Sequence, residues 1–344
     1  MKELLIICTA IVVSSMGWAS LLGVHEDASF TGSARAIDEE LSIEAFFCQV
    51  DDCRTALVSL IEESKRTRCA FYSLDDKEIA EVLAENSALI VMDEENLWRK
   101  EQVWKEKGKE HLIVADGSSG YMHNKFCVFD EDRVMTGSMN PTSNGIDRND
   151  NNMVVISSRS IAANYLHKFR QMYHHRIFKD PDADNRPFPR VKDSNEGILI
   201  ENHFCPEDRC EEKIIEHIEG AETSIHFMTF SFTSEGISET IIGKMDEIEV
   251  RGIFENWQAG SRWSQFHRLD GLAPGEFIRS SHEGNMHHKV FIIDAKTTIT
   301  GSYNPSQNAN RNNDENIIII NDEDTSKRFM REFDRIWEKH EERQ

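Results

Sequence analysis

Two copies of one motif of reactive side chains stand in this chain of 344 residues. Each copy reads His-x-Lys-x4-Asp-x6-Gly-Ser-x-Asn. The first copy consists of His123, Lys125, Asp130, Gly137, Ser138 and Asn140. The second copy consists of His287, Lys289, Asp294, Gly301, Ser302 and Asn304. Every member of the second copy lies 164 positions after its counterpart, so the chain contains an internal repeat. A repeat of reactive side chains indicates one site built from two halves.

The spacing inside the motif brings its two basic side chains together. Side chains alternate between the faces of a strand, so the imidazole and ammonium groups of a His-x-Lys pair point to the same side. A neutral imidazole can act as a nucleophile or a base, and a protonated one can donate a proton to a leaving group. Both forms are accessible near neutral pH. Two histidines, one from each copy, can therefore divide these tasks, and we expect the adjacent His288 to lie on the opposite face.

This double motif resembles the phospholipase D superfamily, whose members carry two such segments. The resemblance covers roughly residues 40–340. It implies that one histidine forms a covalent phosphohistidine while the other protonates the leaving alkoxide. It also implies that the motif lysines and asparagines compensate the charge on the phosphate oxygens, with the motif serines in support. These residues are Lys125, Lys289, Asn140 and Asn304, supported by Ser138 and Ser302. We expect no cofactor and no metal at this site.

The two halves differ at one position that bears on mechanism. The second half carries Glu315 where the family often has an acidic residue that orients a histidine, and the first half has Asn151 there. In two-copy family members this residue tends to reach across to the histidine of the other half. We therefore expect Glu315 to support His123 as the nucleophile and Asn151 to face His287. Asp130 and Asp294 each end a strand before a turn, where aspartate is common for structural reasons, and we assign them only a supporting role.

The motif alone leaves the phosphodiester substrate open. The superfamily includes phospholipases, cardiolipin hydrolases and synthases, phosphatidylserine synthases and nucleases. An exported, acidic protein favours a phospholipid substrate with peripheral membrane contact. Tryptophans could flank the cleft, although core packing is the more common fate of Trp98, Trp257 and Trp263. The alternatives are a secreted, metal-independent endonuclease and a phospholipid synthase or transphosphatidylase. Because both motifs are intact, an inactive binding protein is disfavoured, and a monomer suffices for a complete site.

Composition and the N-terminus inform the setting of the protein. The formal charge is -22, from 61 acidic and 39 basic residues, so the surface as a whole repels polyanions such as duplex DNA. Lys2 precedes an apolar run over residues 4–13 and small residues over 14–20. This order predicts a signal peptide over residues 1–20, and an uncleaved membrane anchor is the alternative. We expect an exported protein.

The cysteines agree with export. Cys48 and Cys53 form one Cys-x4-Cys pair, and Cys205 and Cys210 form another at a similar place in the second half. In an oxidising compartment such pairs indicate disulfides, although four cysteines permit three connectivities and a metal site is an alternative. Two further residues, Cys69 and Cys127, lie in apolar strand-like runs and are expected to be buried thiols.

The elements that must position the motifs repeat in the same order. The first half predicts helix, strand, helix and strand over residues 55–64, 69–74, 77–86 and 88–93. The second half predicts the same order over residues 211–221, 224–232, 238–245 and 249–255. An irregular segment then leads to the motif, which predicts a hairpin, followed by one more strand and a closing helix.

Strands that alternate with helices predict an α/β fold with two similar sandwich halves packed around one shared active site. The first repeat is expected over residues 40–178 and the second over residues 197–340. Residues 179–196 are polar and rich in proline, and they predict a linker.

Overall fold

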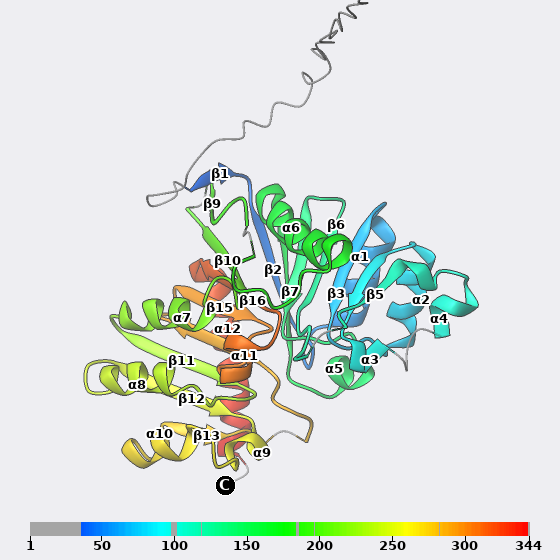
Figure 1. Cartoon of the computed structure of the whole chain (residues 1–344). Helices are drawn as coiled ribbons and strands as arrows, with labels where there is room; N and C mark the ends of the chain where they lie inside the picture. Colours follow the sequence, from blue (N-terminus) through cyan, green and yellow to red (C-terminus); the bar gives the residue numbers. More distant parts are fainter. Residues whose placement is uncertain are drawn as a thin grey trace, which may run out of the picture. The chain divides into compact units, whose positions relative to one another are not determined.

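Each copy of the motif begins at an inner strand of its own β-sheet in the computed structural model (Figure 1). The structure describes residues 36–97, 102–117, 119–183, 186–195, 197–281 and 283–342. The predicted signal peptide and Trp98 lie outside these residues. Among the described helices, none combines the length and the apolar composition that a membrane span requires.

The first half contains a seven-stranded sheet in the order β2-β8-β7-β6-β3-β4-β5. Its strands are β2 (Ser42–Phe47), β3 (Thr67–Phe71), β4 (Leu89–Met92), β5 (Ile113–Ala115), β6 (Lys125–Phe129), β7 (Arg133–Gly137) and β8 (Asn152–Ser157). Its helices are α1 (Cys53–Glu63), α2 (Lys77–Glu85), α3 (Glu94–Leu97), α4 (Gln102–Glu106), the 3-10 turn η1 (Glu110–Leu112), α5 (Ser143–Asp147) and α6 (Arg159–His175).

The second half repeats this order in a nine-stranded sheet, β1-β9-β10-β16-β15-β14-β11-β12-β13. Its strands are β1 (Ile37–Glu39), β9 (Arg190–Asp193), β10 (Leu199–Cys205), β11 (Ser224–Thr229), β12 (Glu249–Phe254), β13 (Phe277–Arg279), β14 (Lys289–Ile293), β15 (Thr297–Gly301) and β16 (Glu315–Asn321). Its helices are α7 (Cys210–Glu219), α8 (Glu235–Lys244), α9 (Asn256–Ala259), α10 (Phe266–Leu272), α11 (Gln307–Arg311) and α12 (Glu323–Glu341).

The motif occupies the same antiparallel hairpin in both halves. Strands β6 and β7 pair in the first half, and β14 and β15 pair in the second. The first strand of each hairpin also pairs with the strand after the first helix, which places Lys125 opposite Phe71 and Lys289 opposite Thr229. The basic end of each motif therefore lies beside the carboxyl end of a neighbouring strand.

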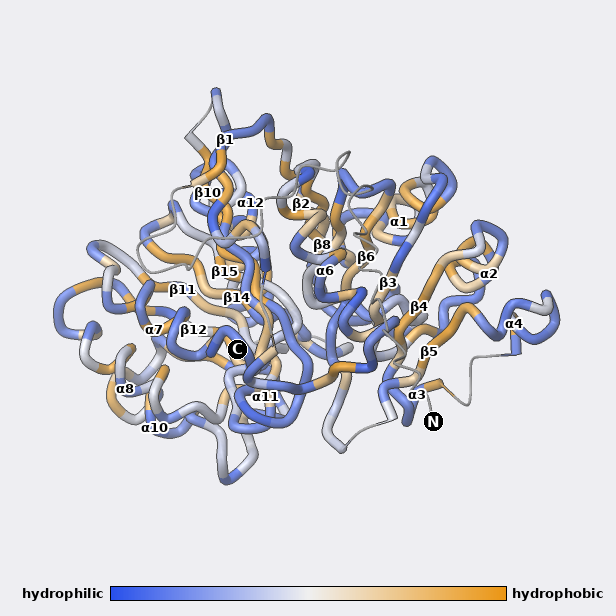
Figure 2. Tube along the Cα trace, turned by 45° about the horizontal axis from the view of Figure 1, so that its top comes forward, coloured by the Kyte–Doolittle hydropathy of each residue, from blue (hydrophilic) through white to orange (hydrophobic). Residues whose placement is uncertain are grey.

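Three hydrophobic clusters divide the molecule into layers. The outer helices α1, α2 and α4 pack on one sheet and α7, α8 and α10 on the other, as Figure 1 shows. The closing helices α6 and α12 contribute Tyr165, Phe169, Phe329 and Phe333 to a central cluster that draws on both sheets. Figure 2 shows the apolar strands of both halves inside polar loops and helix faces. The expected α/β fold of two similar sandwich halves is confirmed.

Several helices begin where a side chain can satisfy unpaired backbone N–H groups. Asp76 accepts from the Ile79 amide at the start of α2, and Ser158 and Asp322 do the same for the first turns of α6 and α12. Such N-caps contribute about 1 kcal/mol each and define where an amphipathic segment starts. These caps define where the closing helices begin relative to the sheets that carry the motifs.

Two predicted irregular regions contain ordered elements. The segment before each motif holds short helices and a third parallel strand, β5 or β13, which is only three residues long. Strands of that length leave too few alternating positions for a periodicity argument. The expected linker includes β9, which pairs with β10 and with β1.

The disulfides match the prediction for the two local pairs and correct it for the third. Cys48–Cys53 and Cys205–Cys210 are bonded, each between the end of a strand and the start of a helix. Cys69 and Cys127, expected to be buried thiols, form a third disulfide. They are direct partners on the antiparallel strands β3 and β6, with Cα atoms 4.1 Å apart. Such closely facing positions can bring two sulfurs into bonding distance, but the pairing of strands is not visible in one sequence.

Candidate active site

The backbone of each motif histidine is bound to the opposite half. The His123 amide donates to the Asp314 carbonyl, and the His287 amide donates to the Asp150 carbonyl, both at 2.9 Å. Parallel bridges join Met122 to Asp314 and Met286 to Asp150. The segments that precede the two lysine strands are therefore held by both halves, and both histidines lie at the junction between the halves.

The side chains of the two histidines also reach across this junction. His123 Nδ1 lies 2.8 Å from Glu315 Oε2, and His287 Nδ1 lies 2.9 Å from Asn151 Oδ1. The expected contacts of Glu315 with His123 and of Asn151 with His287 are confirmed. A partner on Nδ1 leaves Nε2 of each imidazole as the nitrogen available for chemistry.

The motif serines hold these orienting side chains rather than the lysines and asparagines that we expected them to support. Ser302 Oγ donates to Glu315 Oε2 at 2.6 Å, and Ser138 Oγ donates to Asn151 Oδ1 at 2.9 Å. Both hydroxyls are buried. Glu315 Oε1 additionally accepts from the Asn313 side chain at 3.0 Å. The carboxylate is thus fixed from two sides before any substrate binds.

Each motif lysine lies beside its histidine and next to an aromatic ring. Lys125 Nζ donates to the His123 carbonyl at 2.6 Å, and Lys289 Nζ donates to the His287 carbonyl at 2.8 Å. The Tyr72 ring lies 4.9 Å from the His123 ring and 5.3 Å from Lys125 Nζ. The His-x-Lys spacing therefore delivers both basic groups to one site.

Phe230 occupies the corresponding place in the second half. Its ring lies 4.7 Å from the His287 ring and 5.2 Å from Lys289 Nζ. Sequence reasoning missed both Tyr72 and Phe230. Each directly follows a strand, β3 or β11, at the same place in its half, but the sequence does not show that this strand pairs with a motif strand.

The electrostatics of the site favour neutral imidazoles. Burial lowers the pKa of His123 to about 4, although the Glu315 carboxylate raises it in part. Burial and the positive charge of Lys289 hold the pKa of His287 well below its ordinary value. Burial raises the pKa of Glu315, but the contacts with His123 and Lys125 outweigh this and leave the pKa below its ordinary value. The carboxylate is therefore ionised at neutral pH.

The two lysines crowd positive charge into a buried space. Burial lowers the pKa of Lys125 to about 7. Burial and Lys125 together hold the pKa of Lys289 well below its ordinary value. An anion between these groups would raise all four pKa values, because a nearby opposite charge favours the protonated forms of amines and imidazoles. The arrangement is suited to a phosphate.

The loop that closes each motif depends on its glycine. Gly137 and Gly301 have φ of 139° and 149°, and a Cβ atom would lie 2.5 Å from the Asn152 carbonyl oxygen and 2.2 Å from the Asn316 carbonyl oxygen. No side chain fits there. The loop then presents Asn140 or Asn304, and Oδ1 of each is buried without a hydrogen-bond partner among the described residues. The unpaired atom is an acceptor, so a phosphate oxygen would be bound by the Nδ2 donor of the same amide rather than by Oδ1.

Reciprocal hydrogen bonds join the halves below the histidines. Thr136 Oγ1 of the first half donates to Asn316 Oδ1 at 2.8 Å, and Thr300 Oγ1 of the second half donates to Asn152 Oδ1 at 2.9 Å. All four side chains are buried. These residues continue the repeat, but that they join the halves became visible only in three dimensions.

Asp130 and Asp294 are not part of the site. Asp130 accepts from the amides of Lys65 and Arg66 at the start of β3, and Asp294 does the same before β11. Each lies at the opposite end of a five-residue strand from its lysine, about 16 Å away at the usual rise of a strand. Their supporting role is therefore corrected to a structural one, as expected of aspartates that close turns.

His288 and two tryptophans also have defined places. His288 is buried and contacts Asn152 and Glu332, so it belongs to the framework. Trp257 and Trp263 are 61% and 64% exposed, so core packing is the wrong interpretation for both. Trp257 lies 6.0 Å from the Phe230 ring, at the edge of the site.

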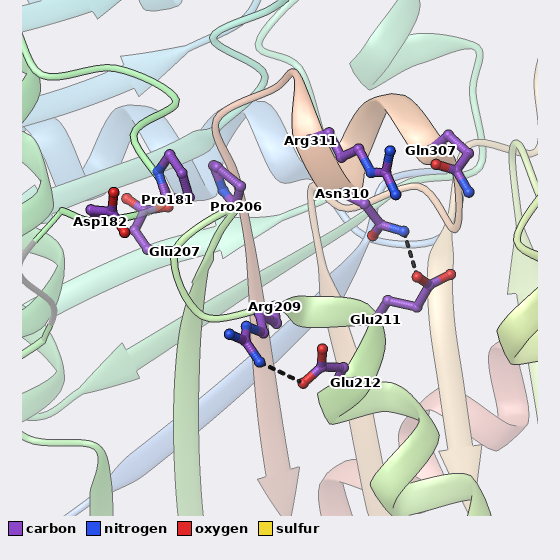
Figure 3. A pocket seen from close by; sticks show the side chains of 10 residues that line it. All are labelled: Pro181, Asp182, Pro206, Glu207, Arg209, Glu211, Glu212, Gln307, Asn310 and Arg311. Carbon is purple, nitrogen blue, oxygen red and sulfur yellow. Dashed lines mark hydrogen bonds and ion pairs between the residues drawn. The ribbon is translucent and has the colours of Figure 1, made fainter.

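A separate pocket of about 500 Å³ lies beside the Cys205–Cys210 loop and α11 (Figure 3). Glu212 pairs with Arg209, and Glu211 accepts from Asn310, as Figure 3 shows. None of the motif residues lines this pocket. Within the part of the chain that the structure describes, no cluster of three His, Cys, Asp or Glu side chains could hold a metal ion.

Known proteins share these features. The family model for the phospholipase D-like domain of cardiolipin synthase matches residues 57–173 and 214–337. Over 142 residues the chain is 30% identical to a mitochondrial cardiolipin hydrolase of Xenopus laevis, and the matched region covers 40% of this chain and 67% of the relative. Over 147 residues it is 29% identical to a phospholipase D of Rickettsia felis, and the matched region covers 41% of this chain and 73% of the relative.

A solved structure shares the fold across both halves. The phosphatidylserine synthase of Haemophilus influenzae Rd KW20 superposes with a TM-score of 0.63 and 14% identity, over 83% of each chain. At that identity the likeness shows the fold alone. Two motif copies, their junction and the match of the family model to both halves lead to one conclusion: the chain belongs to the phospholipase D superfamily and is a phosphodiesterase of that type.

Proposed function

We propose that this enzyme hydrolyses a phospholipid phosphodiester through a covalent phosphohistidine on His123. The observation that carries the proposal is the unequal pair of contacts at the junction, a carboxylate on His123 and an amide on His287. A carboxylate on Nδ1 directs the lone pair of Nε2 toward the site and stabilises the cationic imidazole of the intermediate.

The reaction then proceeds in two balanced steps. In the first step, His123 Nε2 attacks phosphorus, the bond from phosphorus to the leaving oxygen breaks, and protonated His287 donates its proton to that oxygen. In the second step, His287 removes a proton from water, the resulting hydroxide attacks phosphorus, and the bond to His123 breaks. His287 gains the proton for the first step when the bound phosphate raises its pKa.

Four side chains stabilise the charge that develops on the phosphate. Lys125 and Lys289 contribute ammonium groups, and Asn140 and Asn304 contribute amide hydrogen bonds. Preorganised donors of this kind stabilise a transition state strongly where water is excluded. No step in this scheme calls on a metal ion.

A phospholipid fits the surroundings better than a nucleic acid. The chain carries a formal charge of -22, which disfavours approach of a long polyanion. The relatives above include a cardiolipin hydrolase and a phospholipase D by name. The aromatic rings beside both histidines can contact a lipid, although they could also stack on the bases of a single strand. A secreted endonuclease and a lipid synthase or transphosphatidylase remain the alternative functions.

The decisive experiment compares substrates side by side. The purified protein is assayed on phosphatidylcholine, cardiolipin, single-stranded DNA and double-stranded DNA, with His123→Ala as the inactive reference. The exposed His175→Ala, at the end of α6, is the matched control and should behave as wild type. We expect turnover of at least one phospholipid that the His123 variant loses. Cleavage of DNA without cleavage of lipid would replace the proposal by the nuclease alternative, and an alcohol-exchanged phospholipid product would indicate a transferase.

We further propose that the protein is exported and active as a monomer. The N-terminal sequence supports export, and both motif copies in one chain support a complete monomeric site. N-terminal sequencing of protein from culture medium and membranes tests whether residues 1–20 are removed. A specific activity that rises with protein concentration would contradict the monomer.

A further inference from the structure

The second half carries an exposed aromatic rim at the edge of the active site. This rim, defined as residues 257–265, runs from α9 to the start of α10 and contains Trp257, Arg262 and Trp263. Both tryptophans are more than half exposed, whereas Trp104 in the corresponding region of the first half is fully buried. Exposed tryptophans are uncommon on a soluble surface, and two of them in one short segment point to an interaction.

The rim is continuous with the catalytic groups. The Trp257 ring contacts Phe230, and the Phe230 ring contacts His287. At its far end the Gln265 amide donates to the Phe232 carbonyl at 3.0 Å, in the loop that follows β11. Both ends of the rim are therefore attached to the loop that carries Phe230, and Figure 1 shows α9 (yellow) beyond the ends of β12 and β13.

The local charge is opposite to that of the chain. Residues 256–269 contain no aspartate or glutamate, although an average stretch of this length in the chain would contain two or three. They contain Arg262 and Arg268, and the Arg262 guanidinium lies 4.4 Å from the Trp263 ring centre. The corresponding segment of the first half begins instead with Glu94 and Glu95, both exposed. Arg262 therefore places a positive charge in the rim beside Trp263, whereas Arg268 lies on α10 and pairs with Glu239.

We infer that the rim contacts the surface of an anionic phospholipid membrane and seats the enzyme there with its second half against the lipid. Tryptophan prefers the boundary between water and lipid because its ring is apolar and its N–H is polar. An arginine beside it can bind lipid phosphates. This inference rests on the proposed lipid substrate and identifies the surface that delivers it. His287, the proposed proton donor to the leaving group, lies on the same side.

Fluorescence locates the contact without relying on catalysis. The full chain is mixed with vesicles of phosphatidylcholine and phosphatidylglycerol in which the acyl chains carry bromine, which quenches tryptophan at short range. We expect the double variant Trp257→Phe and Trp263→Phe to lose most of the quenched fraction while still binding. An unchanged quenched fraction would overturn the inference, even if another segment such as the N-terminus anchors the protein.

Charge and turnover provide a second readout. Arg262→Gln should weaken binding to anionic vesicles roughly fivefold, because one arginine near an anionic surface contributes about 1 kcal/mol, and salt should remove the difference. Trp263→Ala should reduce turnover of lipid in vesicles but leave turnover of soluble bis(4-nitrophenyl) phosphate unchanged. The exposed Leu272→Ala, at the end of α10, is the matched control. Equal loss on both substrates, or equal loss in the control, would contradict the proposed membrane contact of the rim.

The two proposals fail in different ways. If wild type cleaves no phospholipid but the tryptophan variants lose quenching, the rim stands and the proposed function fails. If wild type cleaves phospholipid and the variants leave the quenching unchanged, the proposed function stands and the proposed membrane contact of the rim is wrong.

Discussion

At the scale of the residue, the two halves of the site are nearly symmetric but differ in the side chain that contacts Nδ1 of each histidine. Both histidines have a neighbouring lysine, an aromatic ring and a serine-held partner on Nδ1. The two partners are Glu315, which is ionised, and Asn151, which carries no charge. The unequal partners provide a physical reason for unequal roles.

The identity of the nucleophile can be tested by trapping. His287→Ala should still form a phosphoenzyme, at least with a leaving group that needs little protonation, because attack depends on His123. His123→Ala should form none. Intact-mass spectrometry after rapid quenching distinguishes the two variants. An adduct on His287 in the His123→Ala protein would reverse the assignment.

The carboxylate should matter more than the amide. Glu315→Gln keeps the shape but removes the charge that stabilises a cationic intermediate, so we expect a rate loss on the order of tenfold, or about 1.4 kcal/mol. Asn151→Ala should cost less. Single-turnover rates of both variants provide the comparison. Equal losses would mean that the difference between the halves has no mechanistic meaning.

The pH profile follows from the shifted pKa values. With the pKa of His123 near 4, the value of kcat/KM should stay high well below pH 6, because the free enzyme keeps a neutral nucleophile. It should fall as pH rises, first because His287 must be protonated and its pKa in the free enzyme lies well below the ordinary value, and again through about 7, where Lys125 loses its charge. Glu315→Gln removes a carboxylate that raises the pKa of Lys125, so the alkaline limb should move to lower pH. An unchanged limb would exclude Lys125 as its source.

At the scale of the element, two features determine how the motif hairpins are held. The glycine at the end of each hairpin permits the close approach of the next strand. In the first half this is β8, which directly follows Asn151, and in the second half it is β16, which begins with Glu315. The disulfide between β3 and β6 ties the lysine strand of the first half to its neighbour. Both act through backbone position rather than through the chemistry of the site.

Gly301→Ala should destabilise the protein and slow catalysis together. The added Cβ must displace the Asn316 backbone, next to Glu315, and strain of this kind costs roughly 1–3 kcal/mol. Urea denaturation and steady-state kinetics measure the two effects. Gly243→Ala, in α8 with open space around it, is the matched control and should be neutral or slightly stabilising. Equal effects at both positions would contradict the steric explanation.

The three disulfides should differ in their contributions to stability. Cys69–Cys127 closes a loop with a sequence separation of 58, against 5 for each of the others. Chain entropy then predicts a loss of about 4 kcal/mol on its removal and about 2 kcal/mol for a local pair. Denaturation of the paired Cys→Ala variants tests this order. Peptide mapping without reduction should first find all three bonds, and free thiols at Cys69 and Cys127 would contradict the pairing.

At the scale of the whole molecule, the active site exists only because two halves of one chain meet. The histidine backbones, the orienting side chains and the threonine–asparagine pairs all bridge the junction. A central hydrophobic cluster shared by both sheets holds this junction. A destabilising change in either half should therefore abolish the activity of the single shared site.

Activity should survive exhaustive treatment with EDTA, because lysine and asparagine side chains already provide charge compensation. Turnover measured before and after chelation, with circular dichroism to monitor the fold, is the test. Loss of turnover that one divalent ion restores would mean that a metal takes part in the reaction.

Much of this architecture could be predicted from the sequence. The repeat, the strand and helix order and the two local disulfides follow from spacing that is local or repeated, and the cross-contact of Glu315 with His123 was implied by the resemblance to the family. The family assignment depends on the same residues. Short strands such as β5 and β13 could not be predicted, because three residues carry no measurable periodicity.

By itself, the sequence determined which side chains can react and that they occur twice. Only the tertiary structure decided which residues gather around them. It paired Cys69 with Cys127 and set Tyr72 and Phe230 against the histidines. The physical reason is that these relations depend on which strands lie side by side. Strand pairing is settled by burial of a shared core over long sequence separations, and no local pattern records it.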